Sequence, residues 1–345
     1  MVKKEAYAVP LLLALKDLIH HTPPDQGPPG LQFLPAEGPI PEESPREFLE
    51  APTAVPEHIG IFPGSFNPLT LAHVELIRQA QERFCLEEMI LVLDSRAMDK
   101  EIFGASLEDR LVMLRLFARA FPHYRIALSS HGRFLDKLQA LRQRYPFASV
   151  SFYFIVGYDT LVRILDPKYY VDREAALREL FQGSYFLVAN RADPASPQPP
   201  SSPAGHHCEA PRPAQDELAG GRAEIEALLD RKENQAFRDR IAFLPLSSFY
   251  ASISSTMVRE RVARGEEISG LVPPEIHGFI EETKLYAPPV AVVQSGRPTR
   301  IDRYGLRLQL LDRLYQKAGP EDLPEFQADL KELLGLVLQD PHILE

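Results

Sequence analysis

Residues 59–73 read IGIFPGSFNPLTLAH, and this stretch decides the fold. The apolar run Ile59–Phe62 predicts a buried strand, and the apolar spacing from Val74 to Phe84 predicts a helix soon after it. Pro63 and Gly64 stand where the strand would lead toward the helix. A glycine at such a point lets backbone N–H groups approach a phosphate without a Cβ in the way. Because ligands of open α/β sheets bind outside the carboxyl ends of the strands, the stretch predicts an anion site.

Thr70 and His73 are the polar side chains that this first motif offers to an anion. They lie three residues apart, so both face one side of the first turns, whether the helix begins with Pro68 after Asn67 or with Thr70 as its cap. A hydroxyl and an imidazole near the positive end of a helix dipole would stabilise charge on a transferred phosphate. The alternative is that residues 67–70 only cap the helix and that His73 lies on the surface.

A second motif, SISST at residues 252–256, precedes a helix whose apolar stripe contains Val258 and Val262. It carries more hydroxyls than one N-cap needs, and Arg259, one turn further, adds a forked cation suited to phosphate oxygens. A redundant cap is the alternative. Each motif follows a predicted strand and begins a helix, and such positions share one edge of a parallel sheet. The two motifs together therefore predict one site for the phosphates of a nucleotide.

Short apolar runs alternate with segments of helical spacing from His58 onward, which is the pattern of βαβ units. The predicted strands are Ile59–Phe62, Met89–Leu93, Tyr124–Leu128, Phe152–Val156, Tyr185–Ala189 and Ile241–Leu244. The predicted helices are Val74–Phe84, Leu107–Ala120, Phe134–Tyr145, Glu174–Phe181 and Glu224–Phe237. Most of the strands are apolar on both faces, as in a sheet covered by helices on both sides. We expect an α/β fold with a doubly wound parallel sheet.

Two segments before and within this alternation have a different composition. Residues 1–57 predict a helix followed by a linker over 22–57, which is crowded with proline and acidic residues and holds no regular core element. Residues 192–221 are rich in Pro, Ser, Ala and Gly and predict a disordered insertion before the last strand. The adjacent ligands of His206-His207-Cys208 within it are a poor match to the spacing of structural zinc sites.

The C-terminal segment predicts a helical extension. After Tyr286 we expect a short coil, and residues 288–345 then contain two amphipathic helices, at 301–318 and 323–339. Their leucine stripes are typical of packing surfaces rather than of ligand sites.

Charge and cysteine content restrict the partners and the compartment. A net charge of −10 argues against a broad nucleic-acid surface, which needs clustered Lys and Arg, but it allows an anionic ligand in a locally basic pocket. Cys85 and Cys208 are the only cysteines and lie in a helical pattern and in the Pro-rich insertion, so we expect no structural disulfide and a reducing cytoplasm. No stretch approaches the roughly 18 uninterrupted apolar residues of a membrane span.

The two motifs resemble those of the nicotinate/nicotinamide mononucleotide adenylyltransferases of the HxGH nucleotidylyltransferase superfamily. Residues 64–73 look like the G-x-F-[ND]-P-x-[HT]-x-G-H segment of that family, and residues 253–259 look like its I-S-S-T-x-x-R segment. The similarity implies a Rossmann-like nucleotidylyltransferase domain over residues 58–287. It also implies transfer of adenylyl from ATP to the 5′-phosphate of a nicotinate or nicotinamide mononucleotide, with Mg²⁺ entering on ATP and no metal ligand in the protein.

The resemblance further implies roles for individual residues. The catalytic residues would be His73, Thr70 and Arg259. The residues that bind ATP or its phosphates would be Gly64, Ser65, Phe66, His73, Gly157, Asp159, Ser254, Ser255, Thr256 and Arg259. The residues that bind the acceptor would be Asn67, Lys100, Arg110, Tyr169 and Tyr170, with a solvated loop as the alternative for Lys100. The partners would be ATP and a phosphorylated small molecule, with neither nucleic acid nor membrane, and homo-oligomerisation stays open.

Two departures from the family pattern keep other functions open. Ala72 stands where the family usually has glycine, and the chain has no tryptophan to stack on a pyridine ring. Tyr169 or Tyr170 would supply the flat surface instead. One alternative is a related transferase that uses pantetheine phosphate with ATP, or an alcohol phosphate with CTP. Another is a nucleotide-binding regulatory protein without turnover.

Overall fold

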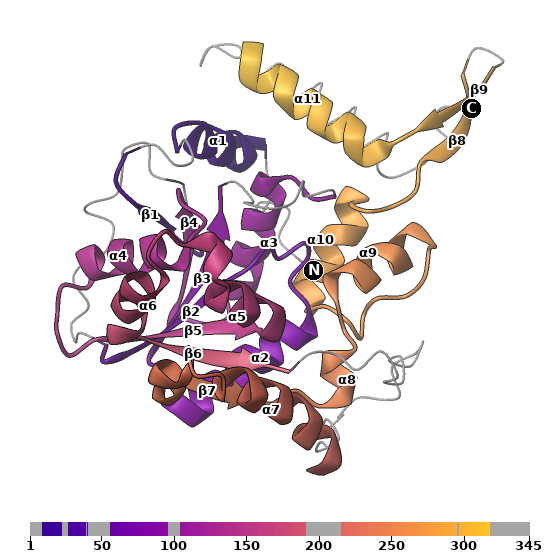
Figure 1. Cartoon of the computed structure of the whole chain (residues 1–345). Helices are drawn as coiled ribbons and strands as arrows, with labels where there is room; N and C mark the ends of the chain where they lie inside the picture. The colour runs from indigo at the N-terminus through magenta and orange to yellow at the C-terminus, as the bar shows by residue number, and fades with distance from the viewer. Residues whose placement is uncertain are drawn as a thin grey trace.

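A mostly parallel sheet of seven strands forms the centre of the molecule (Figure 1). The computed structural model describes residues 9–22, 27–38, 40, 56–95, 104–190, 215–294 and 297–317. The strands are β1 (Leu31–Leu34), β2 (His58–Pro63), β3 (Glu88–Asp94), β4 (Tyr124–Ser129), β5 (Ser151–Gly157), β6 (Ser184–Ala189) and β7 (Ile241–Leu244). Their order is β1-β4-β3-β2-β5-β6-β7, and all six predicted strands are confirmed within one residue at each end.

The strand order reverses between β2 and β5. From β2 the chain proceeds through β3 to β4 on one side, and from β5 through β6 to β7 on the other, with every one of these neighbours parallel. Such a reversal leaves a crevice at the carboxyl ends of the two central strands, because the helices that follow them cover opposite faces. The doubly wound parallel sheet expected from the sequence is confirmed, and β2 lies at its switch point.

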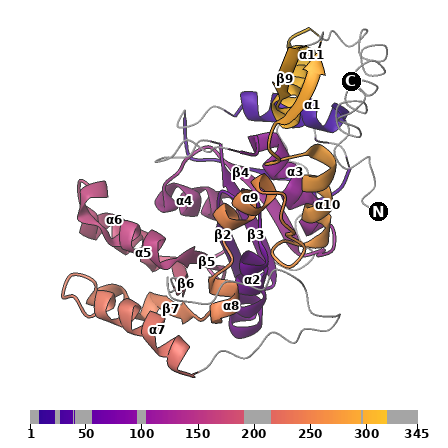
Figure 2. The same cartoon turned by 90° about the vertical axis from the view of Figure 1, so that its right-hand side faces the viewer.

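Helices cover both faces of the sheet, as the two views in Figures 1 and 2 show. One face carries α1 (Val9–His20), α2 (Leu71–Phe84), α3 (Leu107–Ala118), α8 (Ser248–Ala251), α9 (Ser255–Ala263) and α10 (Pro274–Thr283). The other carries α4 (Phe134–Arg144), α5 (Tyr158–Leu165), α6 (Arg173–Gln182), α7 (Gln215–Leu229) and the short 3₁₀ helices η2 (Pro167–Tyr169) and η3 (Gln235–Arg240).

Alternate residues of each central strand enter different cores. Ile90 and Val92 of β3 belong to the core under α4–α7, whereas Met89, Leu91 and Leu93 belong to the core under α1–α3. Successive side chains of a strand point to opposite faces, so a strand between two helical layers must be apolar throughout. This requirement explains why continuous apolar runs in the sequence predicted the positions of the strands correctly.

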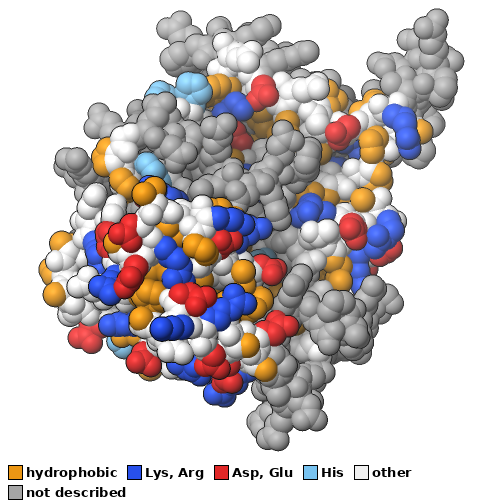
Figure 3. Space-filling view, viewed as in Figure 1, with side chains coloured by type: hydrophobic (Ala, Val, Ile, Leu, Met, Phe, Trp, Pro, Cys, Tyr) orange, Lys and Arg blue, Asp and Glu red, His pale blue; other side chains and the backbone are white. Residues whose placement is uncertain are grey.

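The surface over α5 and α6 carries both signs of charge, and Figure 3 shows basic and acidic side chains interspersed on that side of the molecule. Two of its ion pairs are Lys168 with Asp166 at 3.0 Å and Arg178 with Glu174 at 2.5 Å. Exposed pairs of this kind contribute little to stability because water and salt screen them. Across the described ranges, the helices are all too short or too polar to cross a membrane.

The expectation of a linker without regular core structure over residues 22–57 is wrong for its middle part. Residues 31–34 form β1, which pairs antiparallel with β4 and closes that edge of the sheet. Leu34 and Ile40 are buried. The prolines stand on both sides of this four-residue strand and not within it, so they end the strand without removing a hydrogen bond from the ladder.

The segment after Tyr286 also differs from expectation, because a hairpin replaces the short coil. It consists of β8 (Val290–Gln294) and β9 (Arg297–Ile301), which pair antiparallel. The hairpin leads into α11 (Arg303–Lys317), inside the range expected for the first amphipathic helix. The second expected helix, at 323–339, lies outside the described residues.

The end of the expected insertion needs a correction as well. Residues 215–221, assigned from composition to the disordered segment, belong to α7, and residues 191–214 lie outside the described part of the chain. The helix expected over 224–237 ends at Leu229 and is followed by η3. Gly220 and Gly221 concealed the helical pattern, because glycine is a poor helix former.

Candidate active site

The first motif forms the loop between β2 and α2, at the carboxyl edge of the sheet. Gly64 donates its N–H to the backbone oxygen of Val92 in the neighbouring strand at 3.0 Å. A Cβ at Gly64 would lie 2.9 Å from the ring of Phe66, which is buried and has a positive φ of 43°. Glycine is thus required here by the Phe66 ring, whereas the close approach of a phosphate stays a prediction. Since the Phe66 side chain is part of the core, only its backbone is available to a nucleotide.

His73 is held by the N-terminus of its own helix. Thr70 is the N-cap of α2, which decides between the two helix starts that the sequence left open. The Nδ1 atom of His73 accepts the backbone N–H of Thr70 at 3.0 Å and lies 2.8 Å from the Thr70 hydroxyl oxygen. The imidazole thereby takes the position of the acidic residue in a capping box. An Nδ1 that accepts a hydrogen bond carries no proton, so the neutral ring has its proton on Nε2.

The surroundings of His73 favour the neutral imidazole. Its ring packs against the rings of Phe62 and Phe66, with centroid distances of 5.6 and 5.5 Å. Burial lowers the pKa of His73 to about 4, because the charged form loses its hydration. At neutral pH the residue is therefore a hydrogen-bond donor through Nε2–H and not a cation.

The second motif lies directly against the first. Ser254 is the N-cap of α9, and its hydroxyl oxygen accepts the Met257 N–H at 3.1 Å. Ser255 donates its hydroxyl to the backbone oxygen of Pro68 at 2.7 Å. Arg259 donates through Nη1 to the backbone oxygen of Asn67 at 2.7 Å. The expected meeting of the two motifs at one sheet edge is confirmed, and these contacts attach the loop to α9.

Asn67 is buried and fixes the same loop from its other side. Its Oδ1 accepts the Ala105 N–H at 3.2 Å and the Tyr286 hydroxyl at 2.6 Å. Arg110 is also buried, and its Nη1 donates to the backbone oxygen of Ser65 at 3.3 Å. Burial lowers the pKa of Arg110, but a guanidinium stays charged at physiological pH. Of the two residues expected at the acceptor, Asn67 belongs to the loop and its side chain holds Ala105 and Tyr286, whereas Arg110 contacts the loop backbone.

Gly157 and Asp159 lie across the switch point from Gly64. Ile61 of β2 is in register with Phe154 of β5, so three residues further along each strand Gly64 and Gly157 reach the same level. Gly157 is the N-cap of α5, and Asp159 is an exposed residue of its first turn. The register therefore puts Gly157 at the level of Gly64 across the two central strands, and the contact of Asp159 with the ATP ribose stays a prediction.

The two tyrosines proposed as a stacking surface differ in their surroundings. Tyr169 is 43% exposed, and the Lys168 ammonium lies 4.8 Å from the centre of its ring. Tyr170 donates its hydroxyl to the backbone oxygen of Ile164 at 2.6 Å and packs against the core under α4–α7. Tyr169 is thus the ring that a ligand can reach. Lys100, the remaining predicted acceptor residue, lies outside the described residues.

Tyr286 is a site residue that sequence reasoning did not single out. It follows α10 and has a φ of 65°. Its hydroxyl donates a hydrogen bond to the side chain of Asn67, which is 219 residues earlier in the sequence. A single tyrosine after a helix follows no pattern that would have indicated this contact. In the part of the chain that the structure describes, there is no group of three or more His, Cys, Asp or Glu side chains arranged to hold a metal ion.

The sequence relationships agree with this architecture. Residues 61–261, which contain both motifs and strands β3 to β7, match the model of the cytidylyltransferase-like family. The chain belongs to that family.

Curated relatives point to a narrower group within it. A probable nicotinate-nucleotide adenylyltransferase of Gloeobacter violaceus is 29% identical over 240 residues, which are 68% of this chain and 98% of the relative. The protein of the same description from Trichlorobacter lovleyi is 28% identical over 67% of this chain and 99% of its own length. A solved structure of the Plasmodium falciparum nicotinic acid mononucleotide adenylyltransferase matches 66% of this chain and 97% of its own, with a TM-score of 0.45 and 19% identity. The resemblance recognised in the two motifs is confirmed.

Proposed function

We propose that this protein transfers the adenylyl group of ATP to the 5′-phosphate of a nicotinate or nicotinamide mononucleotide, with release of pyrophosphate. The observation that carries the proposal is the neutral His73, whose Nε2–H is available beside the loop at the switch point of the sheet. The two curated relatives described above, which match over nearly their whole length, support the choice of acceptor.

The reaction requires no nucleophile from the protein. An oxygen of the mononucleotide's 5′-phosphate attacks the α-phosphorus of ATP, and the bond from that phosphorus to the bridging oxygen of pyrophosphate breaks. Catalysis then depends on alignment of the two phosphates and on stabilisation of the charge that grows on the α-phosphate. In this proposal His73 donates its Nε2–H to an α-phosphate oxygen, and Thr70 keeps the imidazole in the tautomer that can do so.

The N-terminus of α9 is proposed to bind the β- and γ-phosphates. Ser254 and Thr256 are exposed there, next to first-turn N–H groups that favour anions. Arg259 has Nη2 3.2 Å from the Thr256 hydroxyl while its Nη1 donates to the loop. One guanidinium can thus fix the loop and place positive charge beside the outgoing pyrophosphate.

The remaining contacts of the nucleotides are assigned from position. Ser65 offers its backbone N–H to the α-phosphate, since the N–H of Gly64 is already donated to Val92, and Asp159 accepts a hydroxyl of the ATP ribose across the switch point. Tyr169 offers an accessible ring to the pyridine of the acceptor.

Mg²⁺ is proposed to arrive with ATP as part of the substrate. This ion keeps several of its waters and binds mainly through substrate phosphates, so it does not require a dedicated cage of side chains. Its chemical contribution would be to neutralise charge on the triphosphate and on the pyrophosphate that leaves.

Pyrophosphate release tests the proposal directly. The purified protein is supplied with Mg²⁺, either ATP or CTP, and one of four acceptors: nicotinate mononucleotide, nicotinamide mononucleotide, pantetheine phosphate or an alcohol phosphate. We expect release only with ATP and a pyridine mononucleotide, and the ratio of the two mononucleotide rates then defines the preference. Release that requires CTP, or that occurs with pantetheine phosphate alone, would indicate a different transferase. Binding of ATP without release with any acceptor would indicate a regulatory protein.

A further inference from the structure

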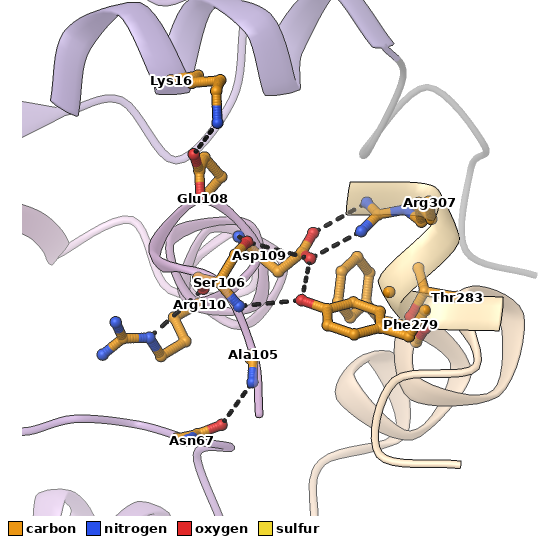
Figure 4. Close-up of polar contacts among 12 residues, drawn as sticks. Lys16, Asn67, Ala105, Ser106, Glu108, Asp109, Arg110, Phe279, Thr283 and Arg307 are labelled. Atoms are coloured by element: carbon orange, nitrogen blue, oxygen red, sulfur yellow. Dashed lines mark hydrogen bonds and ion pairs between the residues drawn. The ribbon is translucent and has the colours of Figure 1, made fainter. Parts of the chain in front are cut away.

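The helix α11 lies outside the residues matched by the family model, yet two of its side chains reach the N-terminus of α3. Arg307 donates through both of its terminal nitrogens to the two carboxylate oxygens of Asp109, at 2.7 and 2.9 Å (Figure 4). Tyr304 donates its hydroxyl to the same carboxylate at 2.6 Å. All three side chains are buried, with Asp109 fully inaccessible to solvent.

The first turn of α3 connects these α11 side chains to the loop of residues 64–70. Tyr304 accepts the backbone N–H of Ser106, the N-cap of α3, at 2.9 Å. The adjacent Ala105 donates its N–H to the side chain of Asn67. One turn further, Arg110 donates to the backbone oxygen of Ser65. Hydrogen bonds, together with the backbone of the first turn of α3, therefore join α11 to both ends of the sequence Ser65-Phe66-Asn67.

Polar contacts are well suited to fix the position of α11 on α3. A cavity of about 160 Å³ lies between α1, α3 and α11, beside Asp109 and with Leu12, Leu308 and Leu311 in its lining. Apolar packing is therefore incomplete beside the ion pair. A bidentate arginine and carboxylate pair specifies both distance and orientation, which apolar contact alone does not.

We propose that Tyr304 and Arg307 are positioning residues for the loop of residues 64–70, acting through Ser106 and Asp109. They hold the first turn of α3 where Ala105 and Arg110 fix the loop that presents the backbone to the α-phosphate. The C-terminal helix thereby completes the support of the active site, although it contributes no atom to the reaction. The effect on turnover rests on the proposed transferase function, whereas the effect on the loop does not.

Turnover of two matched variants tests the first effect. Tyr304→Phe keeps the ring and removes the hydroxyl that bridges Ser106 and Asp109, whereas Tyr315→Phe removes a more exposed hydroxyl of the same helix, bonded to Asp17 at 3.1 Å. We expect kcat of Tyr304→Phe to fall about 10- to 100-fold at a temperature well below its unfolding midpoint, as for a small misplacement of reacting groups. We expect Tyr315→Phe to keep the wild-type kcat. A lower unfolding midpoint with unchanged kcat in Tyr304→Phe means a merely structural role and overturns the proposal.

Hydrogen exchange tests the second effect without any substrate. In Tyr304→Phe, amides of residues 64–70 should exchange faster than in the wild type, and in Tyr315→Phe they should not. Arg307→Lys, which keeps the charge opposite Asp109 but loses the forked contact, should give an intermediate rate. Wild-type exchange at residues 64–70 in Tyr304→Phe overturns the proposal. If the wild-type protein shows no transferase activity, the proposed function fails, and hydrogen exchange alone decides whether α11 positions the loop.

Discussion

Arg259 donates a hydrogen bond through Nη1 to the backbone oxygen of Asn67 at 2.7 Å, across 192 residues of sequence. The bond joins the two motifs that the sequence identified separately, and it fixes the backbone of the loop rather than a side chain. A backbone acceptor is present whatever residue occupies position 67, whereas the guanidinium is specific to arginine. Arg259 and Ser255, which donates to the backbone oxygen of Pro68, together determine how α9 is placed against the first motif.

Replacement of Arg259 by lysine should impair transfer although it conserves the charge. A lysine ammonium does not provide the two donors in fixed geometry that reach Asn67 and Thr256 together. We expect kcat/KM for ATP to fall by about 10- to 100-fold, equivalent to about 1.4–2.8 kcal/mol. The matched control is Arg264→Lys, in an exposed ion pair with Glu266, which should leave steady-state kinetics unchanged. Equal kinetics for the two variants would show that the fork of Arg259 is not used.

Loss of the His73 imidazole should lower turnover far more than substrate affinity. The donor is proposed to act where charge grows in the transition state, so His73→Ala should cost about 3–4 kcal/mol in activation free energy, or about 10²–10³ in kcat. The KM for the acceptor should change little. His123→Ala, at an exposed position, provides the control. Near-normal turnover of His73→Ala in the pyrophosphate assay would exclude His73 from catalysis.

The half-buried imidazole should also make stability depend on pH in a defined window. The pKa of His73 is lowered to about 4 in the folded protein from the ordinary histidine value of 6.5, so between these values the unfolded chain binds more protons. Stability from this group is present above pH 6.5 and is lost as the pH falls toward 4. The total is about 3 kcal/mol at 1.36 kcal/mol per pKa unit.

His73→Gln isolates this contribution, because glutamine can accept the Thr70 N–H at the same helix position but does not titrate. Chemical denaturation of both proteins at several pH values gives the difference in unfolding free energy. We expect the wild type to lose stability relative to the variant as the pH falls from 6.5 to 4. A constant difference across that range would show that His73 titrates with an ordinary pKa.

Alanine at Gly104 should disturb the support of the loop. Gly104 has a φ of 107°, and a Cβ there would lie 2.9 Å from the Tyr286 ring and 3.3 Å from Asn67 Oδ1. Both the backbone conformation and the contact oppose a side chain, so we expect a loss of about 1–3 kcal/mol in unfolding free energy and a lower kcat. Gly270→Ala, where a Cβ meets no atom within 4 Å, is the control. Equal thermal midpoints for the two variants would contradict this expectation.

The strands of the main sheet were predictable because their sequence satisfies a local requirement. A strand buried on both faces must be apolar at every position, and β3 and β5 show this directly in their alternating core contacts. β1 was not predictable, because four residues of mixed polarity among prolines carry little local signal. Its stability comes from pairing with β4, which is distant in sequence.

The candidate site was likewise predictable only in part. Two helix starts with excess hydroxyls, a histidine and an arginine were sufficient to predict that the two motifs meet at one edge of the sheet, since helix capping depends on neighbouring residues. The sequence did not reveal that Ser255 and Arg259 contact the backbone of the first motif, or that Gly64 makes room for Phe66. These contacts depend on the arrangement of elements that only folding brings together.

The sequence by itself determined the doubly wound sheet, the positions of the two motifs at helix starts and the family, because each depends on residues within a few turns of one another. Only the tertiary structure decided the tautomer of His73, the burial of Asn67 and the attachment of α11 to α3 through Asp109 and Arg307. A hydrogen bond between distant residues leaves no periodic trace in either segment. Its partners are selected by the geometry of the folded chain and by the high free-energy cost of burying a charge without a partner.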